Sequence, residues 1–389
     1  MNDRKADPGM QTWRARFRTW LASVDIPRGG DSMEQSYARN LLWHKALAEA
    51  GWLGVNWPVE FGGQGLSTEH QMAVMEEIAL ARAPFPLAII NLYVVGPTLV
   101  SWGTPEQKER HLRRILQGDE IWYQGFSEPD AGSDLASMRT RAVLDGEHFI
   151  VNGQKIWTSQ AHFADYCGLM VRTDPASTDH RGLTYLIVDM KTPGVRVQPV
   201  EQLTGDAMFN QVFFDEVRVP VSNMIGALHK GWNVAMRSLA SERSVIIAQR
   251  KAEAEAMFRL VLDALATRYA DVGQLPERIA LRLGHARMQL AALDAQVRDL
   301  VVRLQHDGAP PGTESVDKLI LTDVEQEIFA LAFDMLGPYR QVPGGAPLGM
   351  DSSSMIYEFF YSRSRSISGG TTQVQRDIVA KRVLKLPLA

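Results

Sequence analysis

The stretch QGFSEPDAGSD, residues 124–134, is the densest group of small and polar residues in the chain. Its glycines allow backbone N–H groups to approach a flat or phosphorylated ligand, and Ser127 and Ser133 add hydroxyl groups at fixed offsets. Taken alone, such a stretch after a strand is more often an ordinary loop than a ligand site. The patterns on either side of it decide the fold.

The residues before this stretch have helical periodicity. From Met10 to about Gly118 apolar residues recur every three or four positions, with breaks at residues 58–65 and 84–86. Trp13, Phe17, Trp20 and Leu21 follow the same spacing and predict an ordinary first helix rather than a transit peptide. Residues 1–120 are therefore predicted to form an all-helical domain.

The pattern changes to strands over residues 121–227. Short runs rich in Val, Ile, Phe, Tyr and Thr are separated by Gly, Asp and Pro. The dipeptide Asn152-Gly153 accepts positive φ at both turn positions, so it predicts a tight hairpin between strands at 148–151 and 154–157. Further strands are predicted at residues 166–172, 183–189, 194–199 and 211–219. Together they make a central β-barrel-like domain.

Helical periodicity returns after Gly231. Four long segments are predicted to be helices, at residues 232–269, 276–306, 315–336 and 352–366. A bend at Gly369-Gly370 precedes a last helix at 372–384. The third domain, residues 228–389, is therefore a four-helix bundle, and the fold class is α+β. Junctions between such domains are favoured places for a large ligand.

Composition excludes several classes of protein. At 389 residues the chain is long enough for two or three domains of ~150 residues each. Its net charge of −4 gives no general attraction to nucleic acid. No apolar run approaches the ~18 residues that span a bilayer, so we expect no membrane span and a reducing, cytoplasmic compartment.

Cysteine and histidine are used sparingly. Cys167 is the only cysteine, so it cannot form an internal disulfide, and we interpret it as a small buried apolar residue. The nine histidines show no metal-ligand spacing, and no metal is predicted.

Several stretches resemble the acyl-CoA dehydrogenase family. Residues 125–134 are similar to the family's first signature, and NGQKIWT, residues 152–158, follows at the family's distance. The resemblance covers nearly the whole chain, and it continues at residues 57–58, 61–63, 213–220 and 370–376. It implies an N-terminal helical domain, a central β-domain and a C-terminal four-helix bundle, with flavin held where the last two meet.

The resemblance implies FAD as cofactor and assigns residues to it. Ser127 resembles the hydroxyl residue that hydrogen-bonds the flavin ring near N5, and Trp157 resembles the indole that packs on the flavin face away from substrate. Ser133 resembles the residue between flavin and the pantetheine chain of the substrate. The implied cofactor-binding residues are Gln124, Phe126, Ser127, Gly132, Ser133, Trp157, Thr158, Ser159, Thr371 and Gln373.

The family carries its catalytic base at either of two positions. The first, in the loop before the last motif, is ISGGT at residues 367–371 and has no carboxylate. The second, a Glu-Arg pair on the first bundle helix, is matched by Glu242 and Arg243. The resemblance therefore implies Glu242 as the base, Arg243 as a helper that orients substrate or base, and the Gly369 N–H as a donor to the enolate oxygen. Ser133, Glu242, Arg243 and Gly369 would contact the substrate.

The implied reaction removes the Cα proton and the Cβ hydride of an acyl-CoA thioester and leaves a trans-2-enoyl-CoA. By the same resemblance, an electron-transfer flavoprotein would accept the electrons. The family's Arg-x-x-Phe-Gly stretch, whose arginine reaches the FAD of a neighbouring subunit, is matched only loosely by RYADVGQ, residues 268–274.

Similar departures occur in a branch of the family that forms heterotetramers from two related chains. Homo-oligomer and heterotetramer thus remain open, and so do two alternative functions. One is a non-catalytic or partner-dependent subunit, and the other is a flavin acyl-CoA oxidase or monooxygenase of the same fold.

Overall fold

A computed structural model describes residues 8–27, 32–87, 89–269, 275–305 and 312–387. The side chains of residues 8, 237–245, 301 and 304–305 lie outside this description. The chain divides into two compact units. The first is Met1–Val74 with Ala83–Glu242, and the second is Met75–Arg82 with Arg243–Ala389.

The first unit begins with helices, as predicted. Their bounds are α1 (Pro8–Ser23), α2 (Met33–Glu49), α3 (Thr68–Leu80), α4 (Gly96–Trp102) and α5 (Pro105–Gln117), with α3 divided between the two units. Phe17 of α1 is buried against Trp52, with ring centroids 4.6 Å apart, and Trp20 stacks on Trp43. The aromatic periodicity of the first helix therefore builds part of the core of this unit.

Local sequence sets the helix ends. At the start of α5 the Thr104 hydroxyl accepts from the Gln107 N–H while the Gln107 side chain returns to the Thr104 N–H. This reciprocal pair satisfies two backbone donors that a helix start leaves free. Gly118 ends the helix at φ 73, a conformation that costs glycine little.

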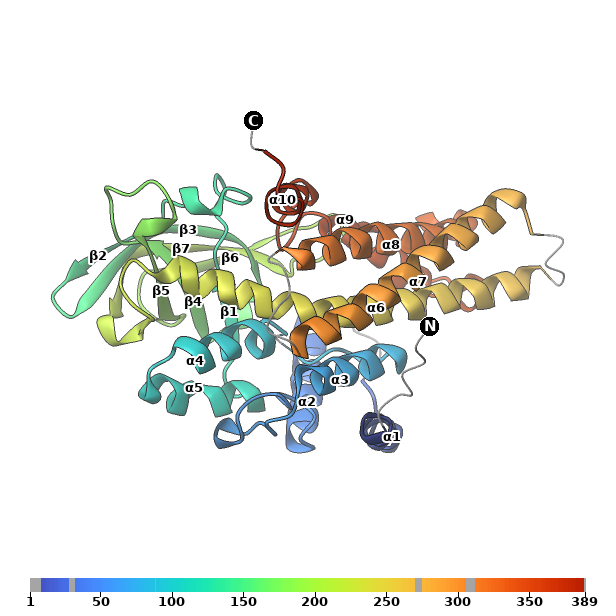
Figure 1. The fold of residues 1–389 in the computed structure, drawn as a ribbon, viewed down its shortest axis with the longest axis horizontal. Helices are drawn as coiled ribbons and strands as arrows, with labels where there is room; N and C mark the ends of the chain where they lie inside the picture. Colours follow the sequence, from blue (N-terminus) through green and yellow to red (C-terminus); the bar gives the residue numbers. More distant parts are fainter. Residues whose placement is uncertain (1–7, 28–31, 88, 270–274, 306–311, 388–389) are drawn as a thin grey trace. The chain divides into compact units, whose positions relative to one another are not determined.

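The central sheet has eight strands, drawn in green to yellow in Figure 1. They are β1 (Trp122–Gly125), β2 (Arg141–Asp145), β3 (His148–Ser159), β4 (Tyr166–Arg172), β5 (Leu183–Asp189), β6 (Val195–Val200), β7 (Phe209–Pro220) and β8 (Met224–Ile225). Their order is β6-β7-β3-β2-β4-β5-β8, with β1 parallel to β4. The sheet is thus an open path rather than a closed barrel. β2 and the short β8 were not predicted.

The predicted hairpin at Asn152-Gly153 is wrong. β3 runs unbroken through both residues, and the β2–β3 turn lies earlier, at Gly146 and Glu147. Asn152 instead forms a bulge against β7: its side-chain amide donates to Glu216 Oε1 at 2.7 Å and its oxygen accepts the Glu216 N–H. The positive φ that the dipeptide tolerates serves this bulge, with Gly153 at φ 146.

The core of the sheet confirms the interpretation of Cys167. Its side chain is completely buried among apolar neighbours such as Tyr123, Leu169 and Val188. Burial raises the pKa of the Cys167 thiol to about 12. A thiol held neutral in this way is not a nucleophile at neutral pH.

The second unit is a helical bundle. Its helices are α6 (Gly231–Arg268, from Arg243 onward), α7 (Glu277–Gln305), α8 (Thr313–Met335), α9 (Ser352–Ser364) and α10 (Thr372–Ile378), coloured from yellow to red in Figure 1. α8 packs against α7, α9 and α10. The predicted last helix, residues 372–384, is α-helical to Ile378 and continues as a π-helix over Val379–Val383. No described helix combines the length and apolar character that crossing a bilayer requires.

A partly buried ionic cluster joins three helices of this bundle. Arg365, just after α9, contacts Glu325 of α8 at 2.7 Å, Glu358 of α9 at 3.2 Å and Glu253 of α6 at 3.4 Å. Arg250 of α6 also forms an ion pair with Glu325. Three glutamates therefore share two arginines, which leaves a net formal charge of −1, with Glu325 fully buried and Glu253 and Glu358 half-buried.

Glu358 is expected to weaken the bundle at neutral pH. Burial raises the pKa of its carboxyl, opposed by Arg365 but reinforced by Glu253 and Glu325. A carboxyl group whose pKa is higher in the folded than in the unfolded state stabilises the fold at pH values below its unfolded-state pKa. This stabilisation is lost as the pH rises through the folded-state pKa. Glu358→Gln should therefore raise the thermal unfolding midpoint at pH 7, and the gain should shrink as pH falls toward the ordinary glutamate pKa. Glu255→Gln, at a half-buried glutamate of α6 that pairs with Lys251 at 3.3 Å, is the control. A lowered midpoint for Glu358→Gln at pH 7 would contradict this reasoning.

Candidate active site

The loop after β1 carries the first group of predicted residues. Gln124 is the third residue of β1, and Gly125 ends the strand where a Cβ would meet Leu169 and Cys167 at 2.8 and 2.9 Å. The Phe126 ring is buried edge-on against Tyr185. Packing therefore fixes the base of the loop just before Ser127, which is half-buried.

A buried ion pair fastens this loop to β3. Lys155 is fully buried, and its Nζ donates to Glu128 Oε1 at 2.8 Å and to the Phe126 carbonyl at 2.9 Å. Glu128 in turn accepts the N–H groups of Arg139 and Thr140. We call Lys155 and Glu128 the loop clamp. Both residues stand inside the quoted motifs, but their pairing was not predicted from the sequence.

Burial and the charge of the partner act in opposite directions on the pKa of each residue of the loop clamp. Burial alone would raise the pKa of Glu128, but the Lys155 ammonium and the hydrogen bonds to its carboxylate outweigh this, and the pKa is lowered. Burial lowers the pKa of Lys155, and Glu128 opposes the shift. Ionised partners at 2.8 Å make a charge-assisted hydrogen bond, roughly twice as strong as a neutral one.

Trp157 lies next to the clamp and is unusual for a tryptophan in a strand. The residue is 57% exposed, and its backbone has φ 61 at an irregularity in the β3–β7 pairing. The Ile156 N–H donates to the Ser127 carbonyl at 2.9 Å, so the Ser127 loop and the Trp157 strand are directly joined. A bulky residue in left-handed backbone is strained, and such strain is concentrated at functional sites.

Thr158 and Ser159 complete the end of β3. Thr158 is buried, and its hydroxyl donates to the Asn210 carbonyl at 2.6 Å, while the Asn210 amide returns to the Thr158 carbonyl at 3.1 Å. His162 Nδ1 lies 3.0 Å from the Asn210 side-chain oxygen. Ser159 is half-buried opposite Phe209. Sequence reasoning missed Asn210 and His162, which support this end of the strand.

Gly132 and Ser133 are exposed at the far part of the loop. A Cβ at Gly132 would meet no atom within 4 Å, so the space beside this backbone is open. Ser133 is likewise exposed. The first unit therefore brings eight predicted residues onto two joined segments, residues 124–133 and 157–159.

The second unit holds the C-terminal group. Gly369 is exposed at φ 64 and Gly370 follows at φ 93, so the predicted bend is present. The Thr371 hydroxyl accepts the Val374 N–H at 3.2 Å and caps α10. Gln373 is exposed in the first turn of α10. Thr371 thus has a local structural role in addition to the one predicted for it.

The predicted base lies in α6. Glu242 and Arg243 fall on either side of the division between the two units. Their side chains lie outside the described part of the structure, as do residues 270–274 of the loosely matching RYADVGQ stretch. The roles of Glu242 and Arg243 therefore stay predictions.

Each of the three parts of the chain matches a domain family. Residues 8–119 match the acyl-CoA dehydrogenase N-terminal domain, residues 124–217 the middle domain and residues 229–384 the C-terminal domain. The chain belongs to the acyl-CoA dehydrogenase family. It is thereby a flavin-dependent oxidoreductase of lipid degradation, and FAD as cofactor and the predicted fold class are confirmed.

Similar proteins span the whole chain. This acyl-CoA dehydrogenase is 39% identical to acyl-CoA dehydrogenase IpdE1 of Mycobacterium tuberculosis, over 97% of this chain and 98% of that protein. It is similar to a chain of the ChsE4-ChsE5 complex from Mycobacterium tuberculosis, with TM-score 0.85, 31% identity and full coverage of both chains. It is also similar to a chain titled Tcur3481-Tcur3483 steroid ACAD, with TM-score 0.85, 29% identity and full coverage of both chains.

The residues of the first unit fit a flat aromatic cofactor. Among the described residues, the exposed Trp157 indole has one ring neighbour, Phe209 at 6.2 Å, and the packing of these residues does not account for its exposure or its positive φ. An aromatic ligand stacked on this face would account for both. In this acyl-CoA dehydrogenase, Trp157 with the adjoining Ser127 loop is therefore the part of the first unit suited to hold FAD.

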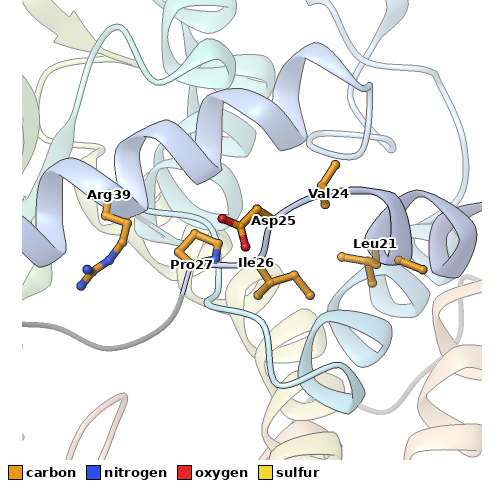
Figure 2. A pocket seen from close by; sticks show the side chains of 7 residues that line it. Leu21, Val24, Asp25, Ile26, Pro27 and Arg39 are labelled. Carbon is orange, nitrogen blue, oxygen red and sulfur yellow. The ribbon is translucent and has the colours of Figure 1, made fainter.

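A surface cavity of about 600 Å³ lies elsewhere in the first unit. It is lined by Leu21, Ala22, Val24, Asp25, Ile26, Pro27 and Arg39, at the end of α1 and along α2 (Figure 2). None of these residues belongs to the predicted site of the acyl-CoA dehydrogenase. The described residues contain no group of three or more His, Cys, Asp or Glu side chains that could hold a metal ion.

Proposed function

We propose that this chain oxidises the Cα–Cβ bond of an acyl-CoA thioester to a trans-2-enoyl-CoA and passes the electrons to an external acceptor, an electron-transfer flavoprotein. The observation that carries this proposal is the exposed, strained Trp157 joined to the Ser127 loop in a chain of this family. We also propose domains at residues 1–120, 121–227 and 228–389, which the family matches at 8–119, 124–217 and 229–384 support.

Bound FAD supplies a hydride acceptor at flavin N5. The chain's part in holding it would be to stack Trp157 on the ring face away from substrate and to offer the Ser127 hydroxyl and Phe126 backbone near N5. Thr158 would reach the flavin edge through its backbone or as an acceptor, because its hydroxyl proton already serves Asn210. The remaining predicted contacts are Gln124, Gly132, Ser133, Ser159, Thr371 and Gln373.

Proton removal would be the task of Glu242. A thioester α-proton is too weakly acidic to leave to a carboxylate unless the enolate oxygen is stabilised as charge develops. The Gly369 N–H would donate to that oxygen, and Arg243 would orient substrate or base. A water-poor pocket would also raise the pKa of the Glu242 carboxyl toward neutrality, which suits a general base.

A partner-dependent role is the second candidate. The solved chains to which this one is similar include members of assemblies titled with two different chains, the ChsE4-ChsE5 complex and Tcur3481-Tcur3483. The full set of proposed flavin and proton-transfer residues, from Ser127 and Trp157 to Glu242, argues for a catalytic chain. An assembly with a related subunit is compatible with this, and so is a homo-oligomer.

Product analysis tests the proposed reaction. The purified protein is incubated anaerobically with an acyl-CoA and an electron-accepting dye, and the thioester is examined by mass spectrometry. Loss of two hydrogens with equivalent dye reduction supports dehydrogenation. A reaction that needs oxygen instead of the dye would indicate an oxidase or monooxygenase. No product with any thioester until a related chain is added would favour the partner-dependent subunit.

Trp157→Gly separates a flavin-stacking residue from a core residue. Glycine adopts φ 61 without the ~1–3 kcal/mol that left-handed backbone costs other residues. We therefore expect the FAD-free variant to unfold at a temperature no lower than the FAD-free wild type, while bound FAD per chain falls sharply. Trp157→Phe, which keeps an aromatic face, should retain more FAD than Trp157→Gly. A core tryptophan would instead cost ~3–5 kcal/mol on truncation and leave the FAD content of the folded fraction unchanged.

A further inference from the structure

The loop that carries Gly369 is held by two side chains of the bundle. Lys318 of α8 donates from its Nζ to the carbonyl oxygens of both Ser368 and Gly370. Gln375 of α10 is buried, and its amide donates to the intervening Gly369 carbonyl at 3.0 Å. Three consecutive carbonyl groups are thereby hydrogen-bonded to the bundle.

The directions of these carbonyl groups also fix where the N–H groups of the loop point. In a trans peptide unit the C=O and the following N–H point in opposite directions, and the described chain has no cis peptide bond. The N–H groups of Gly369 and Thr371 therefore point away from the same Lys318 ammonium. Within the described residues these two N–H groups, and that of Gly370, donate to no protein acceptor.

We propose that Lys318 is a positioning residue, which together with Gln375 aims the Gly369 N–H at the thioester carbonyl. This inference rests on the proposed function, because it concerns the side chains that hold the N–H donor which the proposed reaction needs. A loop with left-handed backbone at φ 64 and φ 93 has no side chain of its own to define its orientation. The two hydrogen bonds from Lys318, to the carbonyls of Ser368 and Gly370, fix the orientation of the loop on the side opposite these N–H groups.

The burial of Gln375 supports the same reading. Its side-chain oxygen has no hydrogen-bond partner among the described residues, whereas its amide nitrogen contacts two carbonyls of the loop. The described hydrogen bonds of this buried amide therefore all go to the backbone of residues 369–370. A buried side-chain amide whose nitrogen is hydrogen-bonded while its oxygen is not is unusual, and this indicates that the role of Gln375 is to hold the loop.

The test compares Lys318→Met with Lys251→Met in the FAD-loaded enzyme. Lys251 also lies in the bundle, where it pairs with Asp294 at 2.7 Å and with Glu255 at 3.3 Å, so it controls for the loss of a buried, ion-paired lysine. Misplacing the donor should lower kcat of Lys318→Met about tenfold with little change in KM, since the contact strengthens only as the enolate forms. Lys251→Met should keep kcat near the wild-type value.

Amide hydrogen exchange gives a readout that does not depend on activity. The Thr372 N–H donates to the Ser366 carbonyl at 3.0 Å, and it should exchange faster in FAD-free Lys318→Met than in Lys251→Met if Lys318 holds the loop. Gln375→Leu, of similar volume, provides a second variant should Lys318→Met fail to fold, with the same expected results. Equal kcat and equal exchange in loop and control variants would overturn the proposal. A wild-type enzyme that dehydrogenates no thioester would refute the proposed function instead, and exchange would still report on the loop.

Discussion

Glu242→Gln is expected to bind FAD as the wild type does and to turn over at least ~10²-fold more slowly, the lower range for a lost general base. Glutamine keeps the size and shape of the side chain but cannot accept the α-proton. Steady-state turnover with a saturating acyl-CoA and an artificial electron acceptor measures the effect. The FAD content of the purified variant is measured in the same sample.

A second readout ties the effect to proton transfer. With an α-deuterated thioester, a wild-type base should exchange the label with water, and Glu242→Gln should lose this exchange along with turnover. Glu255→Gln is the matched control on the same helix, where the carboxylate pairs with Lys251 at 3.3 Å. Turnover of Glu242→Gln within a few fold of that control would reject Glu242 as the base.

Lys155→Met is expected to be the most destabilising single change in the first unit. It leaves Glu128 with its charge uncompensated at a site where both partners are buried, a situation that costs ~3–5 kcal/mol. It also frees the Phe126 carbonyl, so the loop that carries Ser127 loses its side-chain attachment to β3, although the hydrogen bond from the Ile156 N–H to the Ser127 carbonyl remains. Chemical denaturation should show the loss of stability, and the folded fraction should retain little FAD.

A double variant and a surface control sharpen this test. Lys155→Met with Glu128→Leu removes both charges and should recover part of the stability, but not FAD binding, because the loop still lacks its side-chain attachment to β3. Lys191→Met, which breaks an exposed pair with Asp165 at 3.3 Å, should change stability by less than ~1 kcal/mol. Full FAD occupancy in the double variant would show that the loop clamp serves stability alone.

The strands show where sequence patterns are sufficient. β4 and β5 begin and end at the predicted residues, because a continuous apolar run bounded by polar residues has few other folded states. Asn152-Gly153 had the composition of a turn, yet it lies within β3. Pairing of β3 with β7, far away in the chain, selected the bulge, and a local propensity carries no information on such a partner.

In the candidate site, too, local motifs were predicted from the sequence and long-range contacts were not. The family motifs pointed to Ser127 and Trp157, and the structure joins their segments through one backbone hydrogen bond. The supporting contacts were missed because they link residues remote in sequence. Lys155 and Glu128 are 27 positions apart, and Lys318 and Ser368 are 50 apart. A charged residue in an apolar strand, as Lys155 is in HFIVNGQKIWTS, was the available signal for the first pair.

The most direct test of the central claim is the visible spectrum of the chain expressed alone, recorded anaerobically before and after addition of acyl-CoA thioesters. The set should include short, long and steroid-like acyl groups, the last because one similar structure is titled a steroid enzyme. We predict a yellow protein whose flavin band bleaches with one class of thioester, and this would identify cofactor and substrate class together. A colourless protein, or a yellow one that no thioester bleaches, would contradict the account.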